Sequence, residues 1–135
     1  MWRVRAGMLA LVIVCSTAQA SNWFSLGKND AGTLETFIDV SSIRIEGDVR
    51  RAWFKSVYKT HTKKSAGNGK YWSYTVFKTA FNCTEEMFRF EAGNVYYEDG
   101  TNESMPAENY PKPWEPVPPD TTASAEMQFI CAMKQ

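Results

Sequence analysis

The side chains best suited to ligand binding form a short basic cluster between two β-rich segments. Five cationic or protonatable residues fall within twelve positions, with aromatic residues on both sides. They are Lys59, His61, Lys63, Lys64 and Lys70. Clustered positive charge attracts anions. We therefore expect either a binding site for a sulfated glycan, an anionic lipid headgroup or an acidic protein, or a mobile loop over residues 60–70 that lysine keeps soluble.

The residues that commonly carry catalysis do not form a recognisable set. His61 is the single histidine, so it cannot supply a multi-histidine metal site, and no serine or cysteine nucleophile accompanies it. Two adjacent carboxylate pairs, Glu85–Glu86 and Glu98–Asp99, could in principle exchange protons. Both fall at predicted turns, where solvated edges are the simpler interpretation. We expect no enzyme, no cofactor and no metal site.

The first twenty residues predict a secretory signal peptide. A basic head with Arg3 and Arg5 precedes an apolar run, and Ala18 and Ala20 form a small-x-small exit. The apolar run is shorter than the roughly 20 residues that a membrane-spanning helix needs. We expect cleavage after Ala20, which leaves a mature chain of residues 21–135 that is periplasmic or secreted and has no transmembrane segment.

Cys15, inside this leader, raises the question of a lipid anchor. A bacterial lipoprotein requires a small residue immediately before the modified cysteine, whereas Val14 is bulky. We expect Cys15 to act as a small apolar residue of the leader. The mature protein is then expected to carry no lipid anchor.

Cys83 and Cys131 are the two cysteines of the mature chain. An even pair in an exported protein is typical of a disulfide, because the compartment is oxidising. Closing a loop of about 49 residues would remove entropy from the unfolded chain worth roughly 4 kcal/mol. We therefore expect a structural disulfide between them.

Charge is nearly balanced over the whole chain but not along it. Residues 21–80 hold ten basic and five acidic side chains, and residues 81–135 hold three and ten. This split could steer a charged partner, or neighbouring strands could cancel the field. A net charge near zero argues against a nucleic-acid partner.

The elements that must position these residues are mostly strands. Residues 35–97 show short β-rich segments separated by turn residues. A hairpin turn is expected at 46–48, followed by a strand over 49–58 and another over 71–83. Further turns are expected at 93–94 and 99–100, where glycine and asparagine or aspartate are adjacent.

Residues 106–120 are rich in proline, which excludes a helix interior or a central strand. We expect an extended strap in which Tyr110 and Trp114 either form an exposed aromatic contact or seal the edge of the core. Residues 120–135 then follow helical spacing. The overall prediction is one α+β domain, an antiparallel sheet of five or six strands with one C-terminal helix tethered by Cys83–Cys131.

Three stretches together resemble the surface-adhesin protein E family of small exported bacterial proteins. They are FIDVSSIRIEGDVRRAWF, then FNCTEEMFRF with VYYEDG, and finally PWEPVPPDTTASAEMQFIC. The residues that carry the pattern, within residues 33–133, are Phe37, Ile38, Asp39, Trp53, Cys83, Tyr96, Tyr97, Trp114, Val117, Pro118 and Cys131. The resemblance implies a sheet with a disulfide-tethered C-terminal helix and, for function, an adhesin that binds host matrix.

Two functional hypotheses follow from these observations. The first is an exported, non-enzymatic binding protein of the adhesin E type, whose partner is a host matrix protein or a polyanion. The alternative is a periplasmic structural or accessory protein of an envelope assembly with no adhesive role. In that case the aromatic strap would be the docking surface.

Overall fold

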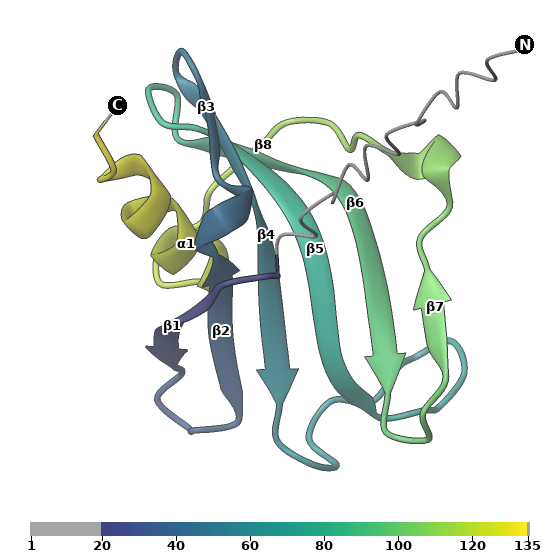
Figure 1. Ribbon diagram of the computed structural model, residues 1–135. Helices are drawn as coiled ribbons and strands as arrows, with labels where there is room; N and C mark the ends of the chain where they lie inside the picture. Colours follow the sequence, from purple (N-terminus) through teal and green to yellow (C-terminus); the bar gives the residue numbers. More distant parts are fainter. Residues whose placement is uncertain (1–19, 135) are drawn as a thin grey trace, which may run out of the picture.

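The computed structural model of the protein describes residues 20–134. The expected leader and its Cys15 lie outside the described residues. Within them the chain forms eight strands and one α-helix (Figure 1). The elements are β1 (Trp23–Lys28), β2 (Leu34–Asp39), β3 (Arg44–Glu46), β4 (Val49–Tyr58), β5 (Trp72–Asn82), β6 (Met87–Tyr97), β7 (Asn102–Ser104), β8 (Glu115–Pro116) and α1 (Thr122–Cys131), with short 3-10 turns at Val40–Ser42 and Ala107–Asn109.

All eight strands belong to one antiparallel sheet, which confirms the α+β prediction. The order across the sheet is β1-β2-β4-β5-β6-β7. The short strands β3 and β8 pair with β4 and β6, beside the ends that β2 and β7 leave uncovered. The sheet is therefore six strands wide, and the total of eight is somewhat higher than the five or six expected.

Side-chain alternation gives the sheet two different faces. In β4, Ala52 and Phe54 are buried in the core beneath α1, whereas Trp53 and Lys55 point to the opposite side. We call the two sides the helix face and the outer face. The core on the helix face consists of Ile38, Ala52, Phe54, Phe81 and Ile130. Ile130 is the one helical member of this cluster, so α1 completes the core.

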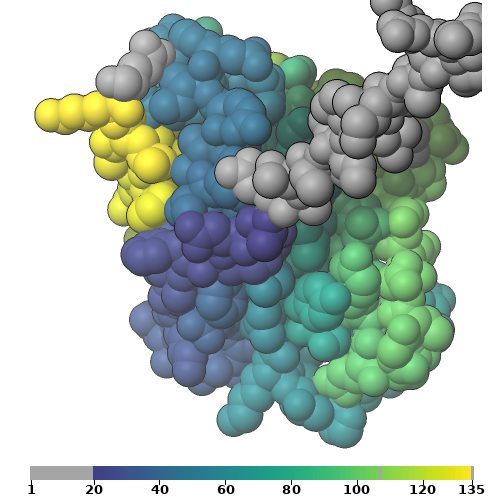
Figure 2. Space-filling view, in the orientation of Figure 1, coloured from purple at the N-terminus to yellow at the C-terminus, as the bar shows by residue number. Residues whose placement is uncertain are grey.

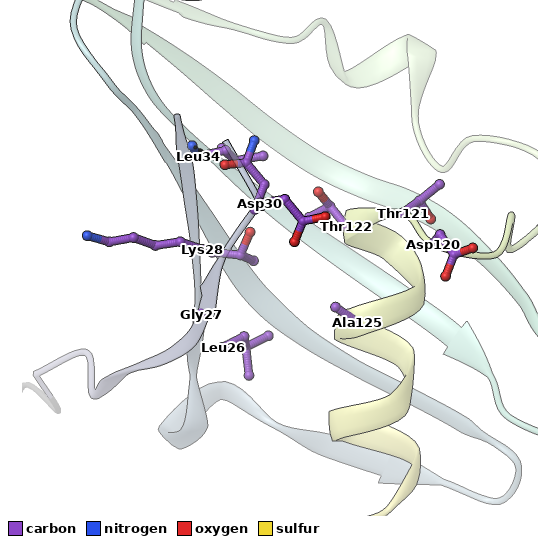
Figure 3. Close-up of a pocket in the computed structure, with 11 residues that line it drawn as sticks. Leu26, Gly27, Lys28, Asp30, Leu34, Asp120, Thr121, Thr122 and Ala125 are labelled. Carbon is purple, nitrogen blue, oxygen red and sulfur yellow. Dashed lines mark hydrogen bonds between the residues drawn. The ribbon is translucent and has the colours of Figure 1, made fainter. Parts of the chain in front are cut away.

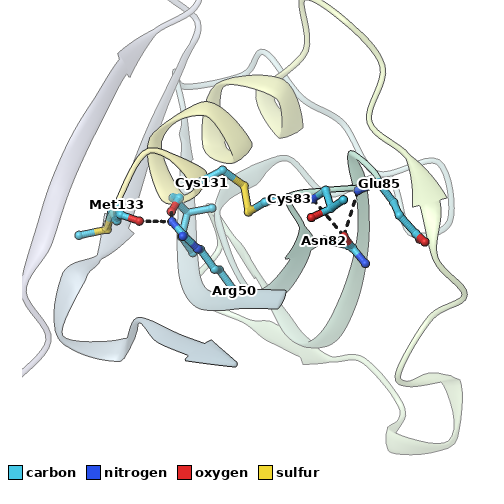
Figure 4. Close-up of a disulfide and its surroundings, with 8 residues drawn as sticks. Arg50, Asn82, Cys83, Glu85, Cys131 and Met133 are labelled. Carbon is cyan, nitrogen blue, oxygen red and sulfur yellow. Dashed lines mark hydrogen bonds between the residues drawn. A yellow bond between two sulfur atoms is a disulfide. The ribbon is translucent and has the colours of Figure 1, made fainter. Parts of the chain in front are cut away.

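Helix α1 is fixed at both ends. Thr121 is its N-cap, and the Thr121 hydroxyl accepts a hydrogen bond of 3.2 Å from the Ser124 amide. Near its C-terminus, Cys131 is bonded to Cys83 of the β5–β6 turn, as expected (Figure 4). The helix ends at Cys131, earlier than the sequence indicated. Because α1 packs against β1 and β4, it lies toward the β1 and β2 side of the sheet, away from β7 (Figures 1 and 2).

Arg50 adds a polar attachment beneath the helix end. Its guanidinium donates a hydrogen bond of 2.7 Å to the Ile130 carbonyl and another to the Met133 carbonyl (Figure 4). These carbonyls belong to the last turn of the helix and the residues after it, where few backbone donors remain. The Ile130 carbonyl also accepts a hydrogen bond of 3.4 Å from the Met133 amide, so the arginine of β4 adds a second donor at this end of the helix.

One sequence expectation about strands is corrected. The expected turn at residues 93–94 is absent, because Gly93 lies inside the continuous strand β6 and pairs with Phe77 of β5. Gly93 serves close packing rather than chain reversal, since the Phe77 ring occupies the space that a β-carbon would need. Trp23 begins the edge strand β1. The turn at 99–100 is confirmed, with Gly100 at φ 84°.

Candidate functional site

The basic cluster lies in the β4–β5 loop, residues 59–71, at the end of the sheet opposite the disulfide. Backbone hydrogen bonds give this loop a defined path. The Trp72 amide donates to the Lys63 carbonyl at 2.8 Å, and the Ser65 amide donates to the Lys70 carbonyl at 2.8 Å. An isolated bridge pairs Lys64 with Tyr71. The expected mobile loop is thus a small hydrogen-bonded hairpin.

Two of its lysines lie over aromatic rings. The Lys63 Nζ atom is 5.6 Å from the centre of the Trp72 ring, and Lys64 Nζ is 5.7 Å from the centre of the Tyr71 ring. A cation over a ring face gains electrostatic attraction and keeps its N–H donors available for another partner. Charge and flat apolar surface therefore occur together here.

Two further residues of the cluster contact carboxylates of the β6–β7 turn. His61 Nε2 lies 3.0 Å from a Glu98 oxygen, and Lys70 Nζ lies 3.1 Å from an Asp99 oxygen. Hydrogen bonds from Thr101, with a further contribution from Lys70, lower the pKa of Asp99 to about 2. His61 and Lys70 thus each have a carboxylate partner within the protein.

The structure therefore divides the five candidate residues into two groups. His61 and Lys70 have a carboxylate partner, whereas for Lys59, Lys63 and Lys64 no carboxylate within residues 20–134 is in ion-pair contact. We call Lys59, Lys63 and Lys64, with the rings of Tyr71 and Trp72, the lysine–aromatic end. These three lysines are therefore available to pair with an anionic group of another molecule.

The two aromatic candidates of the strap lie along the outer side of β6. Trp114 is half-buried, and the Arg89 guanidinium lies 4.6 Å from its ring centre. Tyr110 has Lys112 Nζ 5.3 Å from its ring centre, and partial burial raises the pKa of Tyr110. Both rings are thus partly covered where the strap meets the sheet edge.

The outer face carries aromatic surface that the sequence did not single out. Two shallow hollows of about 350 and 330 Å³ share Trp53 and Asn94 as lining residues. Tyr110 lines the first and Trp23 the second. Nearby, Lys55 Nζ lies 4.6 Å from the centre of the Trp23 ring. The fold brings together rings from residue 23 to residue 110, so a scan along the chain could not group them.

A larger hollow of about 500 Å³ lies between the β1–β2 hairpin and the start of α1 (Figure 3). Asp30 points toward Thr122, whereas the Lys28 side chain extends away from the helix (Figure 3). Asp120, at the beginning of the helix, adds a second carboxylate to the lining. The hollow is therefore acidic on the side that faces α1.

A second cavity, on the helix face, contains the one buried carboxyl group of α1. Glu126 is only 7% exposed, and burial raises its pKa from the ordinary value of 4.5 to about 8. The sequence held a signal for it, because Glu126 lies three residues after Ala123 and four before Ile130, on the apolar side of the helix. A charged residue in that apolar stripe is unusual, and this position alone would have marked Glu126 as a candidate for a buried carboxyl group.

The described residues contain neither a cluster of metal ligands nor a helix that could span a membrane. Within residues 20–134, no group of three or more histidine, cysteine, aspartate or glutamate residues could hold a metal ion. In the same residues, no helix has the length and apolar character needed to span a membrane.

Comparisons with known proteins relate most of the chain to one family. The family described as Surface-adhesin protein E matches residues 23–132. A solved structure of Haemophilus influenzae protein E is similar at 20% identity and a TM-score of 0.55, covering 86% of this chain and 88% of that one. Another, from non-typeable Haemophilus influenzae, is 18% identical with a TM-score of 0.52, covering 86% and 79%.

At these identities the structural likeness shows a shared fold, not a shared ligand. Curated proteins gave no match to the sequence. The family match extends from the first strand to the residue after the disulfide-bonded end of α1. The chain therefore belongs to the surface-adhesin protein E family.

Proposed function

We propose that this protein is an exported, non-enzymatic binding protein of the adhesin type that binds a host matrix protein or a polyanion through its lysine–aromatic end. The observation that carries the proposal is the presence of three lysines that contact no carboxylate within residues 20–134, beside two aromatic rings. Family membership supports the adhesin-like role. Export follows from the expected signal peptide, with cleavage after Ala20 and no lipid anchor at Cys15.

The chemistry of this end suits a sulfated or carboxylated chain better than an isolated anion. The Lys63 and Lys64 ammonium groups can donate to sulfate or carboxylate oxygens while each remains over its ring. The exposed parts of those rings offer an apolar surface for the rest of the ligand. Because the lysines are at the surface, their attraction for a polyanion should weaken as salt rises.

Removing the three unpaired lysines tests the proposed surface. We expect the variant Lys59→Gln/Lys63→Gln/Lys64→Gln to lose at least about tenfold in affinity for heparin, because it loses three exposed charges from one surface. The measurement is a titration of the mature chain, residues 21–135, at several salt concentrations. The salt dependence should decrease together with the affinity.

A matched control keeps the change in net charge the same. Arg44, Lys112 and Lys134 are exposed and lie outside the β4–β5 loop. The variant Arg44→Gln/Lys112→Gln/Lys134→Gln should therefore bind heparin within about twofold of the unmodified chain. Equal losses in the two triple variants would mean that net charge acts without a defined site, and the proposed surface would be abandoned.

The outer face favours a second candidate function. Its two hollows, which share Trp53, and the strap beside them offer an aromatic surface of the kind that protein partners contact. We propose as the alternative that the protein is a periplasmic accessory component of an envelope assembly, docked through this face.

Protease treatment of intact cells distinguishes the two functions. An adhesin must be accessible from outside, so added protease should digest the protein while a known periplasmic protein is spared. Protection of this chain until the outer membrane is opened would contradict the adhesin proposal. In that case, a cross-linker placed at position 53, in place of Trp53, would be used to identify the envelope partner of the periplasmic protein.

A further inference from the structure

The cavity on the helix face lies between α1 and the sheet and adjoins the lysine–aromatic end, with which it shares Trp72. Its volume is about 330 Å³, within the range of small-molecule sites. Strands β4, β5 and β6 supply one wall and the first two turns of α1 supply the other. Its aromatic lining consists of Phe54, Tyr58, Trp72, Phe77, Phe88 and Phe90.

Two polar groups in this lining are buried without a partner. The Trp72 Nε1 and Thr79 Oγ1 atoms have no hydrogen-bond partner within residues 20–134. Glu126 lines the same cavity and is itself only 7% exposed. Buried polar groups are normally paired. Unpaired polar atoms beside a buried carboxyl group in an aromatic cavity are typical of a ligand site.

The charges around Glu126 indicate what the ligand must carry. Glu126 is the only charged side chain in the lining, and Tyr58 of β4 is the only other titratable one. The other lining residues contributed by β2, β5, β6 and α1 are apolar, aromatic or hydroxyl-bearing. An ionised carboxylate buried without a cation is strongly unfavourable, which is why burial favours the protonated form of Glu126. The lining offers no cation, so a ligand that stabilises the ionised form would have to provide one.

We propose that this cavity binds a small organic ammonium ion with an apolar body. The ammonium group pairs with the Glu126 carboxylate, and the body packs among the aromatic rings, whose faces also attract a cation. An ether or hydroxyl oxygen on the body suits the unpaired indole N–H of Trp72. This site would be additional to the proposed adhesive surface, and the two share the Trp72 side chain.

The acidic hollow of Figure 3 supports this assignment independently. It shares Leu34 and Thr122 with the cavity, so the two adjoin beneath the start of α1. Asp30 and Asp120 line the hollow, and Lys28 extends away from the helix (Figure 3). Carboxylates beside the cavity raise the local concentration of cations. The adjoining hollow and the cavity thus both favour a positively charged ligand.

Three probes with one carbon skeleton test the proposal. We would titrate the mature chain at pH 7 with 4-phenylbutylamine, 4-phenylbutanol and 4-phenylbutyrate by calorimetry. The amine is expected to bind at least about tenfold more tightly than the alcohol, because only the amine forms a charge-assisted pair with Glu126. The carboxylate is expected to be the weakest. Equal affinities for the three, or no binding by any of them, would overturn the proposal.

The pH dependence follows from the buried carboxyl group. In the free protein Glu126 must lose its proton before it can pair with the ammonium, and burial also raises the pKa of Tyr58, so the phenol stays neutral through this range. Amine affinity should therefore rise between pH 6 and 8, with release of a proton on binding. An affinity that falls over this range would contradict the proposed pair.

Two variants assign the binding to the cavity. Glu126→Gln should lower the affinity for the amine at least about tenfold and leave the alcohol within about twofold, whereas the exposed control Glu115→Gln should change neither. Ala123→Leu, which keeps Glu126 but adds volume to the cavity wall, should weaken the amine and the alcohol together. Unchanged amine binding in Glu126→Gln would overturn the proposal.

Discussion

Replacement of Cys83 and Cys131 by alanine is expected to lower the free energy of unfolding by about 3–4 kcal/mol, the largest single effect foreseen for this domain. The bond joins residues 48 positions apart, so its loss restores much freedom to the unfolded chain. It also releases α1, a ten-residue helix that would be marginal in isolation. The core loses support because Ile130 is its only helical member.

Chemical denaturation of the mature chain measures this effect. The double variant and the unmodified chain treated with a reductant should unfold at similar denaturant concentrations, and the reductant should have no further effect on the variant. Hydrogen bonds from Arg50 to the Ile130 and Met133 carbonyls still hold the helix end in both cases. A loss below about 1 kcal/mol would show that helix packing and these hydrogen bonds suffice without the disulfide.

Gly93→Ala is expected to lower the free energy of unfolding by about 2–3 kcal/mol, although it adds one methyl group. A β-carbon at position 93 would lie 2.3 Å from two carbons of the Phe77 ring. The ring cannot simply withdraw, because it packs against Phe90 at a centroid distance of 4.9 Å. Either β6 shifts away from β5 or Phe77 moves into the cavity on the helix face, which it also lines.

Gly67→Ala provides the matched control for this substitution. Its β-carbon would have no neighbour within 4 Å, so a change within about 0.5 kcal/mol is expected. If the clash with Phe77 is the cause, Gly93→Ala should be far less damaging in a Phe77→Ala background, and a double-mutant cycle measures this coupling. Equal effects of Gly93→Ala in both backgrounds would assign the cost to β6 itself.

Movement of Phe77 would also link this prediction to the proposed ammonium site. If the ring enters the cavity, Gly93→Ala should weaken 4-phenylbutylamine and 4-phenylbutanol together, as Ala123→Leu should. If β6 shifts instead, stability falls while both probes still bind. The two measurements on one variant therefore show which way the clash is relieved.

The sequence was sufficient for features that depend on local pattern. Short β-rich segments separated by turn residues indicated the long strands, and the spacing of Ala123, Met127 and Ile130 indicated the C-terminal helix. The pairing of Cys83 with Cys131 followed because only two cysteines remain after the leader. The resemblance to the adhesin E family rested on the order of these features along the chain, and the family match bears it out.

The turn expected at residues 93–94 shows where local pattern fails. Glycine next to asparagine is a turn signal because glycine adopts positive φ readily. The same residue also suits a strand where a neighbouring ring needs space, and only the pairing of β5 with β6 shows that Phe77 faces Gly93. Local preference and cross-strand packing thus give opposite interpretations of one glycine, and packing decides between them.

By itself, then, the sequence determined the fold class, the tethered helix and the location of a basic cluster. Only the tertiary structure decided which lysines of that cluster are paired, because Glu98 and Asp99 reach His61 and Lys70 from another hairpin. It likewise decided that Glu126 is buried among aromatic rings. The physical reason is common to both: the ionisation and binding capacity of a side chain depend on its neighbours in space, which strand pairing and helix docking bring from distant parts of the chain.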